Sequence, residues 1–228
     1  MAVDELVKVL DAITRLLGVL AWPALLAFVL VKYAAAFKDF FASLGEFTFK
    51  GGGFEATAKK KQEATAALVA AAIGRPDPEG GPRSAALEAR EAATAVDQVD
   101  RRTLRKASAA WALWVDDRPD NNIYERQSLE ALGVRFVLAH STEEALDKMA
   151  TQRFDVVISD MGRPPDPQAG YTLLDRLRAS GNRTPFIIYA GSNAAEHKAE
   201  AMRRGAMGST NRASELFRYV LTALGREG

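Results

Sequence analysis

From residue 111 onward, short apolar runs alternate regularly with longer segments in which apolar residues recur at helical spacing. Short apolar runs bounded by polar residues are typical of buried strands. They predict strands at Trp111–Val115, Val134–Ala139, Phe154–Ser159, Phe186–Ala190 and Ala206–Thr210. The segments between and after them predict helices at Asn121–Leu132, Thr142–Thr151, Tyr171–Ala179, Ala194–Arg204 and Ser214–Leu224.

The order of these elements, a strand followed by a helix and repeated along the chain, predicts the fold class. Strands that alternate with helices form a parallel sheet covered by helices on both faces. The sequence therefore predicts an α/β domain at residues 111–228, with a flavodoxin-like five-stranded parallel sheet doubly wound by helices. Ser141 and Glu144 have the spacing of a capping box, which predicts the start of one of these helices.

A long apolar run lies near the start of the chain, at residues 16–37. Leu16 to Val31 contains no charged residue, and the apolar character continues past Lys32 to Phe37. Because about 20 apolar residues span a membrane, we expect residues 1–40 to be a single-pass anchor. A cleaved signal peptide and a buried helix of a soluble core stay open as alternatives. Basic residues are richer after the run, which predicts that the C-terminal domain lies in the cytoplasm, at the inner membrane.

Two segments connect the predicted anchor to the α/β domain. Residues 41–58 include three consecutive glycines and predict a small hairpin or tight loop, or a flexible tether. Residues 59–110 are rich in alanine, lysine and glutamate, which favour helix. A Pro/Gly-rich linker at 74–83 interrupts them, and a further helix is predicted from Ser84 to about Ala110. We expect a helical stalk, which either connects the parts or joins copies into a homo-oligomer.

The overall composition argues against several classes of function. The 228 residues include 30 basic and 29 acidic ones and no cysteine. This balance offers no sign of a nucleic-acid partner, and the lack of cysteine excludes disulfides and Cys-ligated metals. His140 and His197 are too few and too scattered for a zinc site. Since the sequence shows neither a P-loop nor a nucleophile–base pair, we do not expect an independent enzyme.

Three carboxylates stand directly after two of the predicted strands. Asp116 and Asp117 follow the first strand, and Asp160 follows the third. Ligands of open parallel sheets bind beyond the carboxyl ends of the strands, so we expect these acids to share one crevice. Like charges at such short range are stabilised by a cation. Oxygen-only ligands suit a hard ion, which predicts Mg²⁺.

The segments WVDDRPDN, VVISD, PFIIYAG and GAMGSTNR together resemble the receiver domain of bacterial two-component response regulators, over roughly Trp111 to Gly225. This resemblance implies that Asp116, Asp117 and Asp160 hold Mg²⁺ together with the Gly162 carbonyl. It also implies that Asp160 is the phosphoacceptor, with a histidine kinase or a small phosphodonor as its partner. A divalent cation that neutralises the phosphoryl oxygens makes a carboxylate an effective nucleophile.

Several positions depart from the family pattern. Ala190 stands where a Ser or Thr hydroxyl normally meets the phosphoryl group, and Ser192 is the substitute we expect. Arg212 occupies the place of the usual lysine. Arginine keeps the positive charge and binds phosphate well, so we expect Arg212 beside the phosphoryl group, although arginine is not a neutral replacement at a tight site. Ser209 replaces the usual switch aromatic. The acidic pocket is therefore expected without the relay that normally reports phosphorylation.

Three hypotheses follow for the whole chain. In the first, it is a membrane-anchored receiver that accepts a phosphoryl group at Asp160 in a Mg²⁺-dependent reaction and then docks to a partner. In the second, it is a pseudo-receiver scaffold that binds its partner without phosphorylation. In the third, it is a membrane effector controlled by a cytosolic sensing domain.

Overall fold

The computed structural model describes residues 52–74, 85–192 and 194–225. The predicted anchor at residues 1–40 and nearly all of the predicted linker at 74–83 lie outside these ranges, so both stay predictions. Within the described ranges, no helix combines the length and apolar character that a membrane crossing requires.

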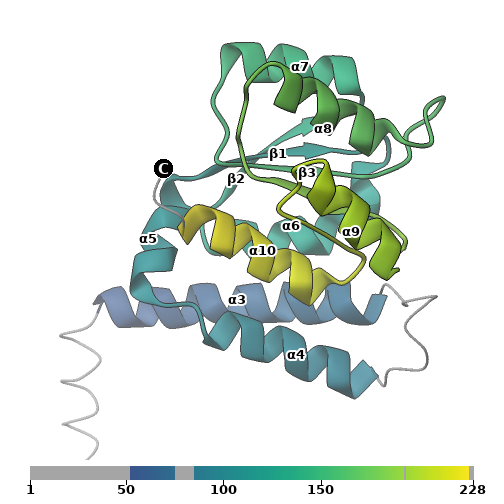
Figure 1. Ribbon diagram of the computed structural model, residues 1–228. Coiled ribbons are helices and arrows are strands. Elements are labelled where there is room, and N and C mark those ends of the chain that lie inside the picture. Colours follow the sequence, from purple (N-terminus) through teal and green to yellow (C-terminus); the bar gives the residue numbers. More distant parts are fainter. Residues whose placement is uncertain (1–51, 75–84, 193, 226–228) are drawn as a thin grey trace, which may run out of the picture. The chain divides into compact units, whose positions relative to one another are not determined.

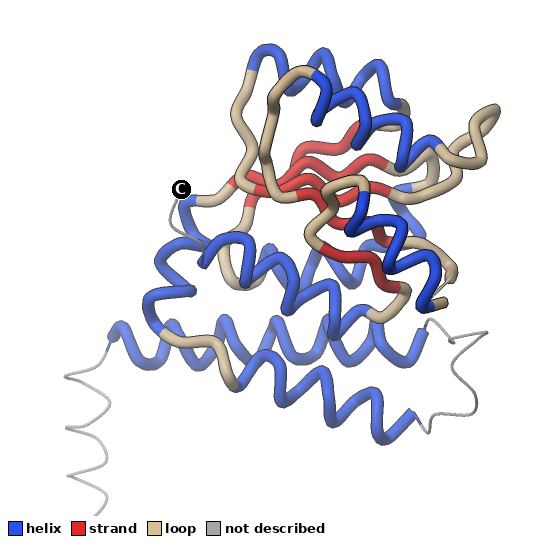
Figure 2. Tube along the Cα trace, in the orientation of Figure 1, coloured by secondary structure: helices blue, strands red, loops and turns tan. Residues whose placement is uncertain are grey.

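A parallel sheet forms the centre of the domain, and its strands appear in red in Figure 2. Its strand order is β2-β1-β3-β4-β5, and every neighbouring pair is parallel. The five strands are β1 (Trp111–Val115), β2 (Arg135–Ala139), β3 (Val156–Ser159), β4 (Phe186–Tyr189) and β5 (Gly208–Thr210). The predicted five-stranded flavodoxin-like sheet is confirmed, although β2, β3 and β5 start one or two residues later than the apolar pattern indicated.

Helices cover both faces of the sheet (Figure 1). α7 (Thr142–Thr151), α8 (Ala169–Ala179) and α9 (Ala195–Arg203) share a hydrophobic cluster with side chains from one face of the sheet. α6 (Ile123–Glu130) and α10 (Ala213–Gly225) pack against the other face. A short 3₁₀ turn, η1 (Pro119–Asn122), precedes α6. All five predicted helices of the domain are thus present among the described residues.

Three more helices precede the domain: α3 (Gly52–Gly74), α4 (Ala85–Asp97) and α5 (Arg101–Ala109). One local prediction is wrong here. The single helix expected from Ser84 to about Ala110 is divided before α5, whose N-cap Asp100 accepts a hydrogen bond from the Thr103 N–H at 2.7 Å. At the end of the Gly-rich segment, residues 52–56 begin α3 and form no part of a hairpin, and the rest of that segment lies outside the described residues.

The N-terminal helices pack against α10, as Figure 1 shows. Leu68 of α3 and Val96 of α4 belong to the same buried cluster as Phe217 and Val220 of α10. Residues 57–228 form one compact unit. This arrangement differs from the predicted stalk. The alanine-rich sequence is helical, as expected, but its small side chains form part of the domain's core.

The contacts of Glu144 at the start of α7 should make a pH-dependent contribution to the stability of the fold. Its Oε2 accepts a hydrogen bond from the His140 backbone N–H at 2.7 Å, and its Oε1 pairs with Lys148 Nζ. These contacts, the His140 bond being the larger, hold the pKa of the Glu144 carboxyl below its ordinary value. Such a group stabilises the fold above its unfolded-state pKa, and the contribution is lost as the pH falls through the folded-state pKa.

We therefore expect Glu144→Gln to reduce the free energy of unfolding at neutral pH by less than about 1 kcal/mol, because the group is partly exposed. In acid the substitution should have almost no effect. Urea unfolding at neutral and acid pH measures the difference, and an equal loss under both conditions would contradict this account.

Candidate acidic metal and phosphoryl site

The three predicted acids converge at the carboxyl edge of the sheet. β1 lies between β2 and β3, and Val115 is in register with Ser159 of β3. Asp116 and Asp160 therefore leave neighbouring strands at the same level, and the Asp160 N–H donates to the Val115 carbonyl at 2.9 Å. Carboxylate oxygens of Asp116, Asp117 and Asp160 lie within 4.8 Å of one another.

Asp116 is the buried member of the three acids and is held by several hydrogen bonds. It is 5% exposed. Its Oδ1 accepts the Arg118 backbone N–H at 2.7 Å, and its Oδ2 accepts the Asn122 side-chain amide at 2.6 Å. The Trp114 indole N–H also approaches Oδ2 at 3.5 Å. These bonds fix the orientation of the Asp116 carboxylate, whereas Asp117 and Asp160 are partly exposed.

A cavity of about 310 Å³ opens over these acids. Its lining is mostly polar and contains Asp116, Asp117, Arg118, Asn121, Asn122, Asp160, Gly162 and Pro164. Gly162, whose carbonyl the resemblance implied as a further ligand, also lines this cavity. Carboxylates with a nearby backbone carbonyl form an oxygen-only donor set, which suits Mg²⁺. The residues present thus fit the cation that the sequence predicted.

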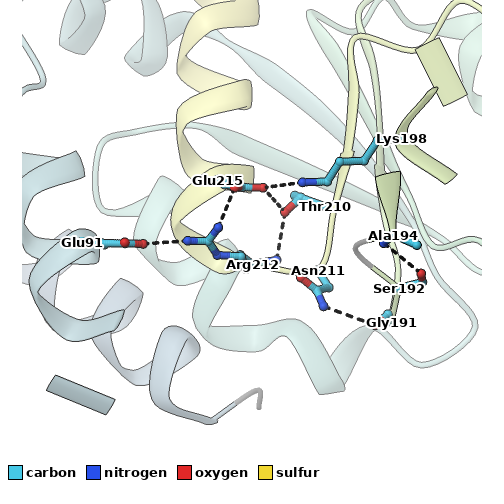
Figure 3. A network of polar contacts seen from close by, with 9 residues as sticks. All are labelled: Glu91, Gly191, Ser192, Ala194, Lys198, Thr210, Asn211, Arg212 and Glu215. Carbon is cyan, nitrogen blue, oxygen red and sulfur yellow. Dashed lines mark hydrogen bonds and ion pairs between the residues drawn. The ribbon is translucent and has the colours of Figure 1, made fainter. Parts of the chain in front are cut away.

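The structure directs Arg212 away from this cavity. Its Nη2 pairs with Glu91 Oε2 of α4 at 2.9 Å, and its Nη1 pairs with Glu215 Oε1 at 2.8 Å (Figure 3). Thr210 braces the same network, because its hydroxyl donates to Glu215 Oε2 at 2.6 Å and accepts the Arg212 N–H at 3.0 Å. The expectation that Arg212 would stand beside the phosphoryl group is not met, because its guanidinium links the sheet edge to α4.

Ser192 does not line the cavity that the acids surround. Its hydroxyl contacts His197 Nδ1 at 2.7 Å and accepts the Ala194 N–H at 3.3 Å. It lines a second cavity of about 500 Å³, together with Ala190 and Ser209. The predicted site residues thus divide into two groups: the acids and Gly162 surround one cavity, while Ser192 and Arg212 have other contacts.

Sequence reasoning missed Arg163, three residues after Asp160. Its side chain is buried, with the whole residue 3% exposed. Burial lowers the pKa of the Arg163 guanidinium, and the charges of Asp160 and Asp116 oppose that change. Charged side chains are seldom buried without partners. The only feature of the sequence that points to a role for Arg163 in the site is its position between Gly162 and Pro164, next to the strand that ends at Asp160.

The Arg212–Glu91 pair gives a measurable coupling between α4 and the α/β domain. The two side chains are 16% and 26% exposed, so solvent screens their attraction only in part. In a double-mutant cycle with Arg212→Met and Glu91→Gln, we expect a coupling free energy of about 1–2 kcal/mol.

The exposed Lys59–Glu63 pair on α3 serves as the control for this cycle, because its side chains are 77% and 56% exposed. We expect its coupling to be no more than about 0.5 kcal/mol. Urea unfolding of the single and double variants provides both values. Equal couplings for the two pairs would show that the link between Arg212 and α4 is not a stabilising contact.

Comparison with known proteins identifies similarity over the part of the chain that carries the acids. Residues 112–213 match the family model of the response regulator receiver domain. The virulence sensor protein BvgS of Bordetella pertussis is 39% identical over 101 residues, which are 42% of this chain and 8% of that protein. The sensor histidine kinase RcsC of Escherichia coli K12 is 31% identical over 93 residues, 41% of this chain and 10% of that protein. The chain thus spans about a tenth of the length of these relatives.

Solved structures of similar chains each match about half of this chain. The receiver domain of the Francisella response regulator 1452 is 26% identical, with a TM-score of 0.47, and the match covers 51% of this chain and 98% of that one. The chemotaxis response regulator CheY4 of Vibrio cholerae is 27% identical, with a TM-score of 0.44, and the match covers 50% of this chain and 98% of that one.

Proposed function

Since residues 112–213 form a response regulator receiver domain, we propose that this chain is a signalling protein in which Asp160 accepts a phosphoryl group with Mg²⁺ as cofactor. The observation that carries the proposal is the convergence of three carboxylates within 4.8 Å at one edge of the sheet. In this proposal the phosphorylated protein acts by docking to a partner, because the phosphoryl group adds negative charge at a surface cavity and so changes the surface that a partner binds.

The residues around the cavity have separate roles in this proposal. Asp116, held by Asn122 and Arg118, and the partly exposed Asp117 would bind the cation together with Asp160 and the Gly162 carbonyl. Mg²⁺, when bound, supplies positive charge that offsets the negative charge of the phosphoryl oxygens. An Asp160 carboxylate oxygen attacks phosphorus, an acyl-phosphate bond forms, and the bond to the donor's leaving group breaks with its electron pair.

The donor we propose is a histidine kinase or a small phosphodonor such as acetyl phosphate. One of the relatives found by sequence, RcsC, is named as a sensor histidine kinase, and another, BvgS, is named as a virulence sensor protein. Within the described part of the chain, Arg118 is the one basic residue in the cavity lining. The phosphoryl oxygens would therefore be neutralised chiefly by the cation and by Arg118, not by Arg212.

The second candidate function is a pseudo-receiver scaffold that binds its partner without phosphorylation. The observation that favours it is the position of Arg212, which pairs with Glu91 and Glu215 instead of entering the cavity. Ala190 also brings no hydroxyl to the end of β4. In this alternative the acids bind a cation but no phosphoryl transfer follows.

We further propose that residues 16–37 anchor the protein in the inner membrane, with the receiver domain in the cytoplasm. The uncharged run from Leu16 to Val31 and the excess of basic residues after it support this placement. Membrane fractions washed with alkaline carbonate test the proposal. The full chain should remain in the pellet, whereas a chain without residues 1–40 should be released.

Phosphoryl transfer is tested by incubating the full chain with acetyl phosphate and Mg²⁺ and measuring the intact mass. The wild type should gain the mass of one phosphoryl group, and Asp160→Asn should gain none. Asp147→Asn, at an exposed acid on α7, is the control for a general effect of charge and should behave as the wild type. An unmodified wild type that still binds Mg²⁺ would favour the pseudo-receiver.

A further inference from the structure

A buried guanidinium contacts the ends of both strands that carry the acids. Arg163 Nη1 donates to the Asp160 carbonyl at 2.6 Å, to the Ser159 hydroxyl at 2.7 Å and, more weakly, to the Val115 carbonyl at 3.5 Å. Its Nη2 donates to Thr142 Oγ1 at 3.1 Å and to the Ala169 carbonyl at 3.0 Å.

These acceptors belong to separate elements of the fold. Ser159 and Asp160 stand at the end of β3, and Val115 ends β1, the strand that precedes Asp116. Thr142 begins α7, directly after the turn that follows β2, and Ala169 begins α8. One planar head group thus joins the ends of two neighbouring strands to the starts of two helices. A planar fork with several donors can do this, whereas an ammonium group cannot.

The same residue closes the loop that forms one wall of the cavity. Arg163 and Asp166 exchange backbone hydrogen bonds at 3.0 and 2.8 Å. The Asp166 carboxylate accepts the Gln168 N–H at 2.7 Å and the Thr172 hydroxyl at 2.6 Å. Gly162 and Pro164, on either side of Arg163, both line the cavity. A buried anchor between them therefore determines where these two lining residues lie.

The loop has little freedom to compensate for a change at this anchor. The Gly170 N–H donates to the Met161 carbonyl at 2.8 Å. A Cβ atom at Gly170 would come within 2.8 Å of the Asp160 carbonyl oxygen and 3.1 Å of Met161 Cα. The backbone after Asp160 is thus packed directly against the start of α8. The Arg163 head group links these two segments, because it donates to the Asp160 carbonyl and to the Ala169 carbonyl.

We propose that Arg163 is the positioning residue of the acidic site, which it serves by holding the Asp160 strand end and the Gly162 loop in the arrangement that binds the cation. This inference rests on the proposed function, because it assigns Arg163 a role in the same site. Two simpler roles are the alternatives to positioning. In one, Arg163 acts only as a positive charge near the acids, and in the other it only stabilises the fold.

Mg²⁺ titration of Arg163→Lys and Arg163→Met distinguishes positioning from charge. If the fork positions the loop, both variants should bind Mg²⁺ at least about tenfold more weakly than the wild type, by analogy with outer-shell partners of metal ligands. If only charge matters, Arg163→Lys should equal the wild type and Arg163→Met should bind more tightly. Either of these last results would overturn the proposal.

Arg178→Lys controls for the general loss of a partly buried arginine that donates to backbone carbonyls. Arg178 also donates to backbone carbonyls, of Asn182, Thr184 and Gly205, at 2.9–3.1 Å, but it does not line the acidic cavity. Its variant should leave Mg²⁺ affinity unchanged. If Arg178→Lys weakened Mg²⁺ binding as much as Arg163→Lys, the role of Arg163 would be one of general stability.

Amide hydrogen exchange provides a readout that does not require a bound metal. In Arg163→Lys, the Gly170 and Asp166 amides should exchange at least about tenfold faster, while the Val157 amide within the sheet stays at its wild-type rate. A wild type that binds no Mg²⁺ would contradict the proposed function alone. Unchanged exchange at Gly170 and Asp166 would overturn the positioning role in either case.

Discussion

Replacement of Asp117 by asparagine is expected to weaken Mg²⁺ binding by roughly a hundredfold or more. The substitution keeps the shape of the side chain but removes one of the three negative charges that lie within 4.8 Å of one another. Loss of an outer-shell partner of a metal ligand typically costs about 10–100-fold in affinity, and loss of a charged ligand should cost at least as much. Calorimetric titration with MgCl₂ measures the change.

Asp120→Asn is the matched control for this experiment. Asp120 lies in η1, only three residues from Asp117, but it is exposed and does not line the cavity. The same change of charge at Asp120 should alter Mg²⁺ affinity by less than about twofold, because solvent and salt screen an exposed charge. Equal losses of Mg²⁺ affinity in the two variants would mean that the affinity depends on the overall negative charge of this surface and not on coordination by Asp117.

The second large effect is expected far from the acids. Leu68 of α3 has 0% exposure and packs in the cluster that contains Phe217 of α10. Truncation of a fully buried leucine removes apolar contacts and leaves a cavity, which typically costs about 2–5 kcal/mol. We therefore expect Leu68→Ala to reduce the free energy of unfolding of the whole chain by about 2–4 kcal/mol, measured by urea denaturation.

Ile73→Ala on the same helix controls for helix propensity and for the loss of an apolar side chain. Ile73 is 51% exposed, so its truncation should cost less than about 1 kcal/mol. The alternative is that α3 belongs to a stalk that stands clear of the α/β domain. In that case, Leu68→Ala and Ile73→Ala would have similarly small effects.

The α/β domain and its acidic pocket were predictable from the sequence for definite physical reasons. A strand buried on both faces must be apolar throughout, so Trp111–Val115 and Val156–Ser159 stand out from the amphipathic segments. The ends of adjacent parallel strands meet at one edge of the sheet. This geometry brings Asp160 to Asp116 and Asp117 without any further information.

The packing of the N-terminal helices was not predictable in the same way. The buried positions of α3 and α4 are mainly alanines, such as Ala64 and Ala92, and alanine occurs as readily on exposed helix faces. The periodicity is therefore weak, and the sequence does not identify which face of α3 is buried. The direction of Arg212 depends on the same packing, because its partner Glu91 is 121 residues away along the chain.

Arg163 shows a different limit of sequence reasoning. An arginine in a loop with several prolines is usually assigned to the surface, because burial of its charge is costly without partners. The acceptors that compensate the burial come from four segments of the chain, the ends of β1 and β3 and the starts of α7 and α8. A role of this kind becomes visible only once the strand ends are placed next to one another.

The central claim is that Asp116, Asp117 and Asp160 together bind a divalent cation that allows Asp160 to accept a phosphoryl group. A crystal structure of the protein with Mg²⁺ and beryllium fluoride, which mimics the phosphoryl group, tests it most directly. The account predicts the cation among the three carboxylates and the Gly162 carbonyl, with beryllium fluoride on an Asp160 oxygen. The account would be contradicted if, at saturating Mg²⁺ and beryllium fluoride, these acids were unoccupied or the ions were bound elsewhere in the protein.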